Sequence, residues 1–138
     1  MSRERLRLAF RLAFTVALLS IMWLAWSSSP GPVTGLMWDK ANHFVAFLVL
    51  AFLLDYSWQR HWQPAQAAPA TFVRLGQDWP KWLLLSLFGV CIELVQLWSG
   101  YRAFEMLDML ADILGIAGYL LLQPILGQHR WLLALKQP

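Results

Sequence analysis

Residues 8–26 read LAFRLAFTVALLSIMWLAW and carry a single charged side chain, Arg11. A helix of about 20 apolar residues is long enough to cross the hydrocarbon core of a bilayer. Three further segments have a similar length and are predominantly apolar: residues 40–58, 82–99 and 107–126. None of them alternates polar and apolar residues over about ten positions, as the strands of membrane barrels do. The pattern predicts an all-α integral membrane protein with four transmembrane helices in a compact bundle.

The composition of the whole chain also indicates a membrane protein. Of its 138 residues, 59% are hydrophobic and 14% are charged, against roughly 45–50% and 25% in soluble domains. A soluble domain of this size leaves a large share of its surface exposed and could not hide so much apolar area. The single cysteine, Cys91, excludes a disulfide-stapled fold. We therefore expect one membrane domain over residues 1–138.

Basic residues are distributed unevenly between the two predicted sides of the membrane. Most of the 11 lie in the N-terminal segment, in the predicted loop at residues 63–80 or in the C-terminal tail, whereas Lys40 and Arg102 lie on the other side. Because basic residues are retained in the cytoplasm, both termini are predicted to face it, in a bacterial cytoplasmic membrane. The net charge of +3 then reflects anchoring at lipid head groups, and no nucleic-acid partner is expected. Six tryptophans near span ends predict an aromatic belt: Trp23, Trp26, Trp58, Trp79, Trp82 and Trp98.

Polar and ionisable side chains recur at helical spacing on one face of three spans. Burying each such group inside a bilayer costs several kcal/mol of free energy, so these residues are candidates for a functional site. Spacings of three and four residues place the members of each set on one helical face. The sets are Asp39, Lys40 and His43 in the second span, Glu93 and Gln96 in the third, and Arg102, Glu105, Asp108 and Asp112 around the start of the fourth.

The depths of these side chains in the membrane predict that they meet. His43 lies about four residues inside its span, Glu93 about six and Asp112 about five, which places all three roughly 6–9 Å below the outer boundary. Since lipid cannot solvate them, the three faces should turn inward and form one site.

The charges of this predicted site do not balance. Five carboxylates face two cations, Lys40 and Arg102, so we expect at least one carboxyl to be neutral, with Glu93 the first candidate. A neutral acid beside ionised groups suits acid–base chemistry, with Glu93, His43 and Asp108 as candidate catalytic residues. Alternatively, the negative charge would attract a divalent cation with oxygen ligands and His43. The candidate ligand-binding residues are Asp39, Lys40, Gln96, Arg102, Glu105 and Asp112.

The polar residues stand in three blocks of sequence: Asp39-Lys40-x-x-His43-Phe44-x-Ala46-Phe47, then Ile92-Glu93-Leu94-x-Gln96, then Arg102-x-x-Glu105-x-x-Asp108-Met109-Leu110-Ala111-Asp112-x-x-Gly115. In their order and spacing these blocks resemble the VanZ-like family, and the resemblance covers residues 36–120. The resemblance implies a small helical integral membrane protein, and the family's namesake is associated with resistance to the glycopeptide teicoplanin. The chain departs from the family at Asp112, where many members have Asn, and before Arg102, where many have Pro.

Three functions remain open at this point. The first is binding of, or action on, a lipid or a lipid-linked or glycopeptide amphiphile at the outer leaflet. The second is a non-enzymatic envelope or interaction protein whose polar residues hold the helices together. The third is a proton- or cation-linked carrier. Gly89, Gly115 and Gly118 are interpreted as packing positions, and Asp55, near the inner end of its span, is expected to be solvated.

Overall fold

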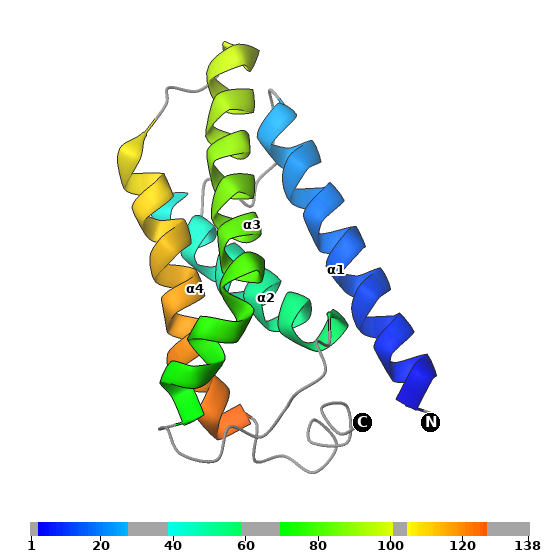
Figure 1. Cartoon of the computed structure of the whole chain (residues 1–138). Coiled ribbons are helices and arrows are strands. Elements are labelled where there is room, and N and C mark those ends of the chain that lie inside the picture. Colours follow the sequence, from blue (N-terminus) through cyan, green and yellow to red (C-terminus); the bar gives the residue numbers. More distant parts are fainter. Residues whose placement is uncertain (1–2, 28–38, 59–69, 101–104, 127–138) are drawn as a thin grey trace.

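A computed structural model describes residues 3–27, 39–58, 70–100 and 105–126, and within these ranges the chain forms helices and no strand. The apolar segments that predicted spans all lie in helices. The helices are α1 (Arg3–Trp26), α2 (Asp39–Ser57), α3 (Ala70–Ser99) and α4 (Met106–Leu126) (Figure 1).

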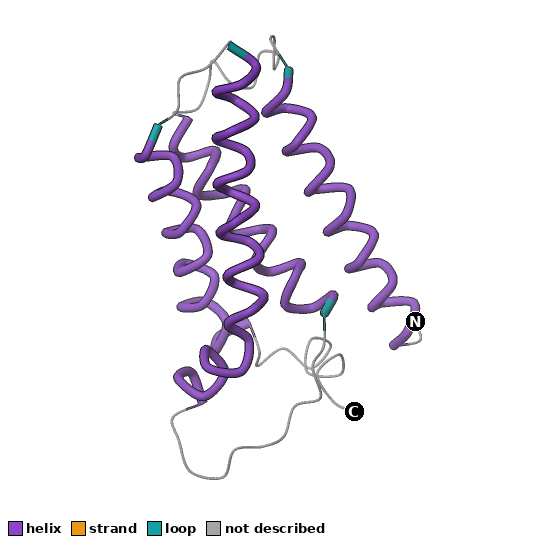
Figure 2. The backbone as a smooth tube through the Cα atoms, turned by 45° about the horizontal axis from the view of Figure 1, so that its top comes forward, coloured by secondary structure: helices purple, strands orange, loops and turns teal. Residues whose placement is uncertain are grey.

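Successive helices run in opposite directions. α1 and α3 begin at one end of the bundle, and α2 and α4 begin at the other, with α2 lying obliquely to its neighbours (Figures 1 and 2). The end of α3 and the starts of α2 and α4 therefore lie at the same end of the molecule, which is the arrangement needed to bring the predicted polar residues together.

Three of the four helices are long and apolar enough to cross a membrane. These segments are Glu4–Trp26, Asp78–Ser99 and Met106–Leu126. α2 does not qualify by the same test, since its 19 residues include Asp39, Lys40 and Asp55. The prediction of an all-helical membrane protein is thus confirmed for three spans.

The prediction of a loop over residues 63–80 is wrong from residue 70 onward. α3 begins at Ala70 and contains Pro80, a residue that usually marks a loop or a helix end. The first turns of α3 mix apolar residues with Arg74, Gln77 and Asp78, so hydropathy did not reveal them, and the continuous apolar part of the helix starts only near Trp82.

Glycine allows α4 to approach α2 closely. A Cβ atom at Gly115 would overlap the carbonyl oxygen of Phe44 and lie 3.0 Å from the backbone nitrogen of Leu48. At Gly118 a Cβ would meet side-chain atoms alone, the end of the Phe44 ring at 3.3 Å and Cδ1 of Leu48 at 3.5 Å. Both glycines are packing positions, as expected for membrane helices, and Gly115 fixes the separation of the two backbones.

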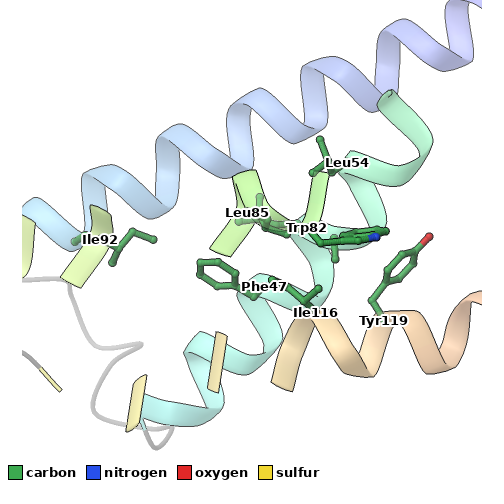
Figure 3. Close-up of a cluster of buried hydrophobic side chains, with 10 residues drawn as sticks. Phe47, Leu54, Trp82, Leu85, Ile92, Ile116 and Tyr119 are labelled. Atoms are coloured by element: carbon green, nitrogen blue, oxygen red, sulfur yellow. The ribbon is translucent and has the colours of Figure 1, made fainter. Parts of the chain in front are cut away.

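An aromatic and aliphatic core is formed by residues of α2, α3 and α4 together with Ala25 of α1 (Figure 3). Phe47 and Tyr119 are fully buried, and the ring of Trp82 lies 6.0 Å from that of Tyr119. Trp82 was predicted to belong to an aromatic belt, and this is wrong: it is only 9% exposed. Trp82 lies on the same helical face as the buried Leu85, whereas Leu83 and Leu84 are exposed, so position near a span end was not sufficient to predict exposure.

The outer surface of the described helices is apolar, as contact with lipid requires. The other five tryptophans of the predicted belt are all at least half exposed. Trp26 and Trp98 pack edge to face with ring centroids 5.4 Å apart, joining the last turns of α1 and α3. Cys91 is exposed on α3 and does not share the buried face of Glu93.

Candidate functional site

A histidine–aspartate pair joins α2 to α4 inside the bundle. Nδ1 of His43 lies 2.8 Å from Oδ1 of Asp112, and both side chains are buried. This contact depends on the close approach of the two helices at Gly115, one turn further along α4. Because the imidazole is bonded through Nδ1, its other nitrogen, Nε2, points to a different neighbour, Asp108, with 4.0 Å between Nε2 and Oδ2.

An ammonium group lies on the more exposed side of this pair. Nζ of Lys40 donates a hydrogen bond to Oε2 of Glu105 at 2.6 Å and lies 3.4 Å from Oδ1 of Asp108. Asp108 is 2% exposed, whereas the Glu105 side chain is about half exposed. Lys40 thus connects a buried carboxylate with one at the surface.

α3 contributes a fully buried acid. Glu93 has no exposed surface, and its Oε2 accepts a hydrogen bond from the backbone N–H of Glu105 at 3.1 Å. This bond connects the last turns of α3 with the start of α4. Gln96, one turn further along α3, is also buried.

Gly89 makes room for Asp112 against α3. A Cβ atom at Gly89 would lie 2.6 Å from Oδ2 of Asp112, so any larger residue there would displace the carboxylate. That same oxygen is buried and has no hydrogen-bond partner in the part of the chain that the structure describes. An unsatisfied buried carboxylate oxygen is costly, and such groups call for an explanation beyond packing.

The predicted convergence of three helices is therefore confirmed. We call this group the His43 cluster. Its members are Asp39, Lys40, His43, Glu93, Glu105, Asp108 and Asp112. Gln96 is buried beside it on the α3 face of Glu93, and Arg102 lies outside the described residues.

A second polar cluster, which the sequence did not predict, lies toward the opposite ends of α2 and α4. The expectation that Asp55 is solvated is wrong, because its side chain is only 4% exposed. Oδ2 of Asp55 accepts hydrogen bonds from the hydroxyl of Tyr119 at 2.6 Å and from Nε2 of Gln123 at 2.9 Å, and Oδ1 accepts one from Nζ of Lys81 at 3.3 Å. Lys81 also lies 3.0 Å from Asp78. We call these five residues the Asp55 cluster.

A comparison with models of known protein families identifies the family of this chain. The family model described as VanZ/LLP1 matches residues 13–127, which include most of α1, all of α2 and α3 and the whole of α4. The chain belongs to the VanZ/LLP1 family. The match extends the resemblance seen in residues 36–120 at both ends, and it includes both polar clusters. Searches of curated proteins and of solved structures found no match.

The His43 cluster of this VanZ/LLP1 protein combines carboxylates with an imidazole and an ammonium group. Among the described residues it holds five carboxylates, His43 and Lys40. His43, Glu93 and Asp108 can each exchange a proton, and they come from three different helices. The described part of the cluster can therefore attract a cation or hydrogen-bond donors, and it holds groups able to move protons next to them.

Proposed function

We propose that this protein has four transmembrane helices, with α2 as the fourth, and that both termini are cytoplasmic. α1 and α3 run in the same direction (Figure 1), so a chain that crosses with both must return across the membrane between them. α2 is the described segment between them, and it runs the opposite way. Its charged residues turn inward: Asp55 is buried, whereas Val45 and Val49 are exposed. The excess of basic residues on one side supports this orientation in a bacterial cytoplasmic membrane.

We further propose that the His43 cluster binds the polar head of an amphiphile in the outer leaflet, either a lipid-linked molecule or a glycopeptide. The observation that carries this proposal is the buried oxygen of Asp112, which has no hydrogen-bond partner among the described residues, within a cluster of carboxylates. Native membrane proteins place costly ionisable groups where they meet a ligand or a proton path. At the end of the bundle that the charge distribution assigns to the outer side, the cluster would lie just below the head groups.

In this proposal, the residues of the His43 cluster have distinct roles. Lys40 and Arg102 would contact an anionic part of the head group, such as a phosphate or carboxylate. The surrounding carboxylates would accept hydrogen bonds from its ammonium, amide or hydroxyl groups. Glu93, His43 and Asp108 are the groups that would exchange protons with the bound molecule. Physiologically, we propose that this binding reduces the action of teicoplanin on the cell envelope.

Substitution of Glu93 tests the proposal in cells. The wild-type protein, expressed in a glycopeptide-susceptible bacterium, should raise the inhibitory concentration of teicoplanin. Glu93→Gln should return it to the vector level while the protein accumulates normally, because Gln keeps the size of the side chain and removes the ionisable group. Glu4→Gln is the matched control, since Glu4 is exposed at the start of α1 and should leave resistance unchanged. Full resistance with Glu93→Gln would contradict the proposal.

A further inference from the structure

Two helical turns face each other where α2 and α4 begin. Asp39 and His43 are four residues apart on α2, and Asp108 and Asp112 are four apart on α4, so each pair shares one face of its helix. One carboxylate oxygen of Asp39, one ring nitrogen of His43 and one oxygen of Asp108 lie within 4.8 Å of one another. His43 and Asp108 are buried, and Asp39 is partly buried. These are three side chains of types that bind metal ions, gathered around one point.

His43 is held in the orientation that a metal ligand needs. Histidines that bind metals through one nitrogen usually donate the other N–H to a carboxylate, which fixes the ring and its tautomer. Here Nδ1 is bonded to Asp112 at 2.8 Å. The same bond, with Nδ1–H as the donor, leaves the lone pair of Nε2 directed at Asp108.

Nε2 of His43 has no hydrogen-bond partner among the described residues, although the side chain is more than nine-tenths buried. Its neighbour Oδ2 of Asp108 is 4.0 Å away, which is too long for a hydrogen bond. Two ligands that each lie about 2.0–2.2 Å from one ion are about 3–4 Å apart, so this separation suits a shared cation. The spacing of His43 and Asp108 thus points to a ligand between them.

A cation between His43 and Asp108 would also neutralise buried carboxylate charge. Asp108 and Asp112 are each 2% exposed, and buried charge is costly unless it is paired or coordinates a metal. Lys40 does not complete the site: its ammonium is closest to Glu105, and its contact with Asp108 is to Oδ1, not to the oxygen that faces His43.

We propose that Asp39, His43 and Asp108 bind one divalent transition-metal ion, with Asp112 as the residue that positions His43. An imidazole nitrogen with two carboxylates favours ions such as Zn²⁺ or Mn²⁺ over Ca²⁺ and Mg²⁺, which prefer all-oxygen sites. Three protein ligands leave a coordination position open. An oxygen of a phosphate or carboxylate head group would occupy that position; this last step rests on the proposed function, whereas the metal site itself does not.

Equilibrium dialysis of the purified full-length protein in detergent tests the site directly. After removal of bound metal with a chelator, the wild type should take up about one Zn²⁺ or Mn²⁺ per chain, measured by elemental analysis. His43→Gln and Asp108→Asn should each weaken binding by at least about tenfold, and Asp112→Asn should weaken it by about 10–100-fold through His43. Asp78→Asn is the matched control, since it removes a carboxylate from the Asp55 cluster, and it should bind like the wild type.

Lys40→Met separates a metal site from a network that is only structural. Removing the ammonium group leaves the three ligands in place and takes away a competing positive charge, so Zn²⁺ should bind more tightly, by about tenfold. A structural network would give no metal binding in either protein. The proposal would be overturned if neither the wild type nor Lys40→Met bound Zn²⁺ or Mn²⁺. It would also be overturned if His43→Gln and Asp108→Asn bound the metal as tightly as the wild type. No amphiphile takes part in the dialysis experiment, so its failure would contradict the metal site alone. Binding of the amphiphile is tested separately by the teicoplanin experiment with Glu93→Gln.

Discussion

The two polar clusters of this protein lie about 18 Å apart along α2 and are built in different ways. In the Asp55 cluster, one carboxylate accepts hydrogen bonds from three side chains of α3 and α4, and both of its oxygens are used. In the His43 cluster, carboxylates outnumber cations among the described residues, and Oδ2 of Asp112 is buried without a hydrogen bond there. A saturated network holds helices together, whereas an unsaturated one keeps the capacity to bind something else.

Burial of charge alone therefore does not distinguish the two clusters of this bundle. Asp55 and Asp112 are almost equally buried, at 4% and 2% exposure. What separates them is the number of donors that each carboxylate meets. If this distinction is correct, substitutions in the Asp55 cluster should change stability, and substitutions in the His43 cluster should change binding.

The largest loss of stability is expected for Asp55→Asn. Both oxygens of Asp55 accept hydrogen bonds, so an Asn amide must turn its NH₂ group toward a donor, and Lys81 loses a counter-ion. We expect the free energy of unfolding to fall by about 3 kcal/mol, measured by unfolding with SDS in mild detergent. Metal binding and teicoplanin resistance, normalised to folded protein, should be unchanged. If Asp55→Asn had the same unfolding free energy as the wild type, the Asp55 cluster would not stabilise the helix bundle as described.

Gly115→Ala should also be strongly destabilising, because the new methyl group would overlap the Phe44 carbonyl and force α4 away from α2. Overpacking of this kind costs about 1–3 kcal/mol, and it should weaken the His43–Asp112 contact as well. Gly118→Ala is the control, since its methyl group would meet only the ends of two movable side chains, Phe44 and Leu48. It should cost less than about 1 kcal/mol, because alanine also favours the helix. Equal effects of the two substitutions would show that the helices do not approach at Gly115 as described.

A smaller effect is expected for Tyr119→Phe. The substitution removes one hydrogen bond to Asp55, at 2.6 Å, and leaves those from Gln123 and Lys81. The cost should be about 1.5 kcal/mol, the value typical of a hydrogen bond to a charged group. In the Asp55→Asn background the same change should cost much less, because the two residues share one interaction. Full additivity in this double-mutant cycle would contradict the proposed network.

Most of the fold could be predicted from the sequence, since a bilayer fixes the length of an apolar helix. The four predicted segments correspond to the four helices, and the matched spacing of Asp39 and His43 with Asp108 and Asp112 predicted their convergence. The start of α3 could not be predicted from hydropathy, because polar and charged residues interrupt its apolar ones, and Pro80 suggested a loop where the helix continues.

The Asp55 cluster was missed because depth was judged from position along the helix. α2 lies obliquely (Figure 1), so its last turn is covered by α3 and α4, and Asp55 is buried. A signal was nevertheless present in α4. Its polar face continues past Gly115 at spacings of four to Tyr119 and Gln123. Polar side chains that run along the whole length of a span need polar partners near both of its ends.

Thermal unfolding of Glu93→Gln beside the wild type, in the same detergent, tests the difference between the clusters most directly. Gln can still accept the hydrogen bond from the backbone of Glu105 while the ionisable group is removed. If the His43 cluster is a binding site, the melting temperature should be unchanged or higher, because functional sites sacrifice stability. A fall of many degrees, comparable to that of Asp55→Asn, would mean that the His43 cluster holds the helices together and would contradict its assignment as a binding site.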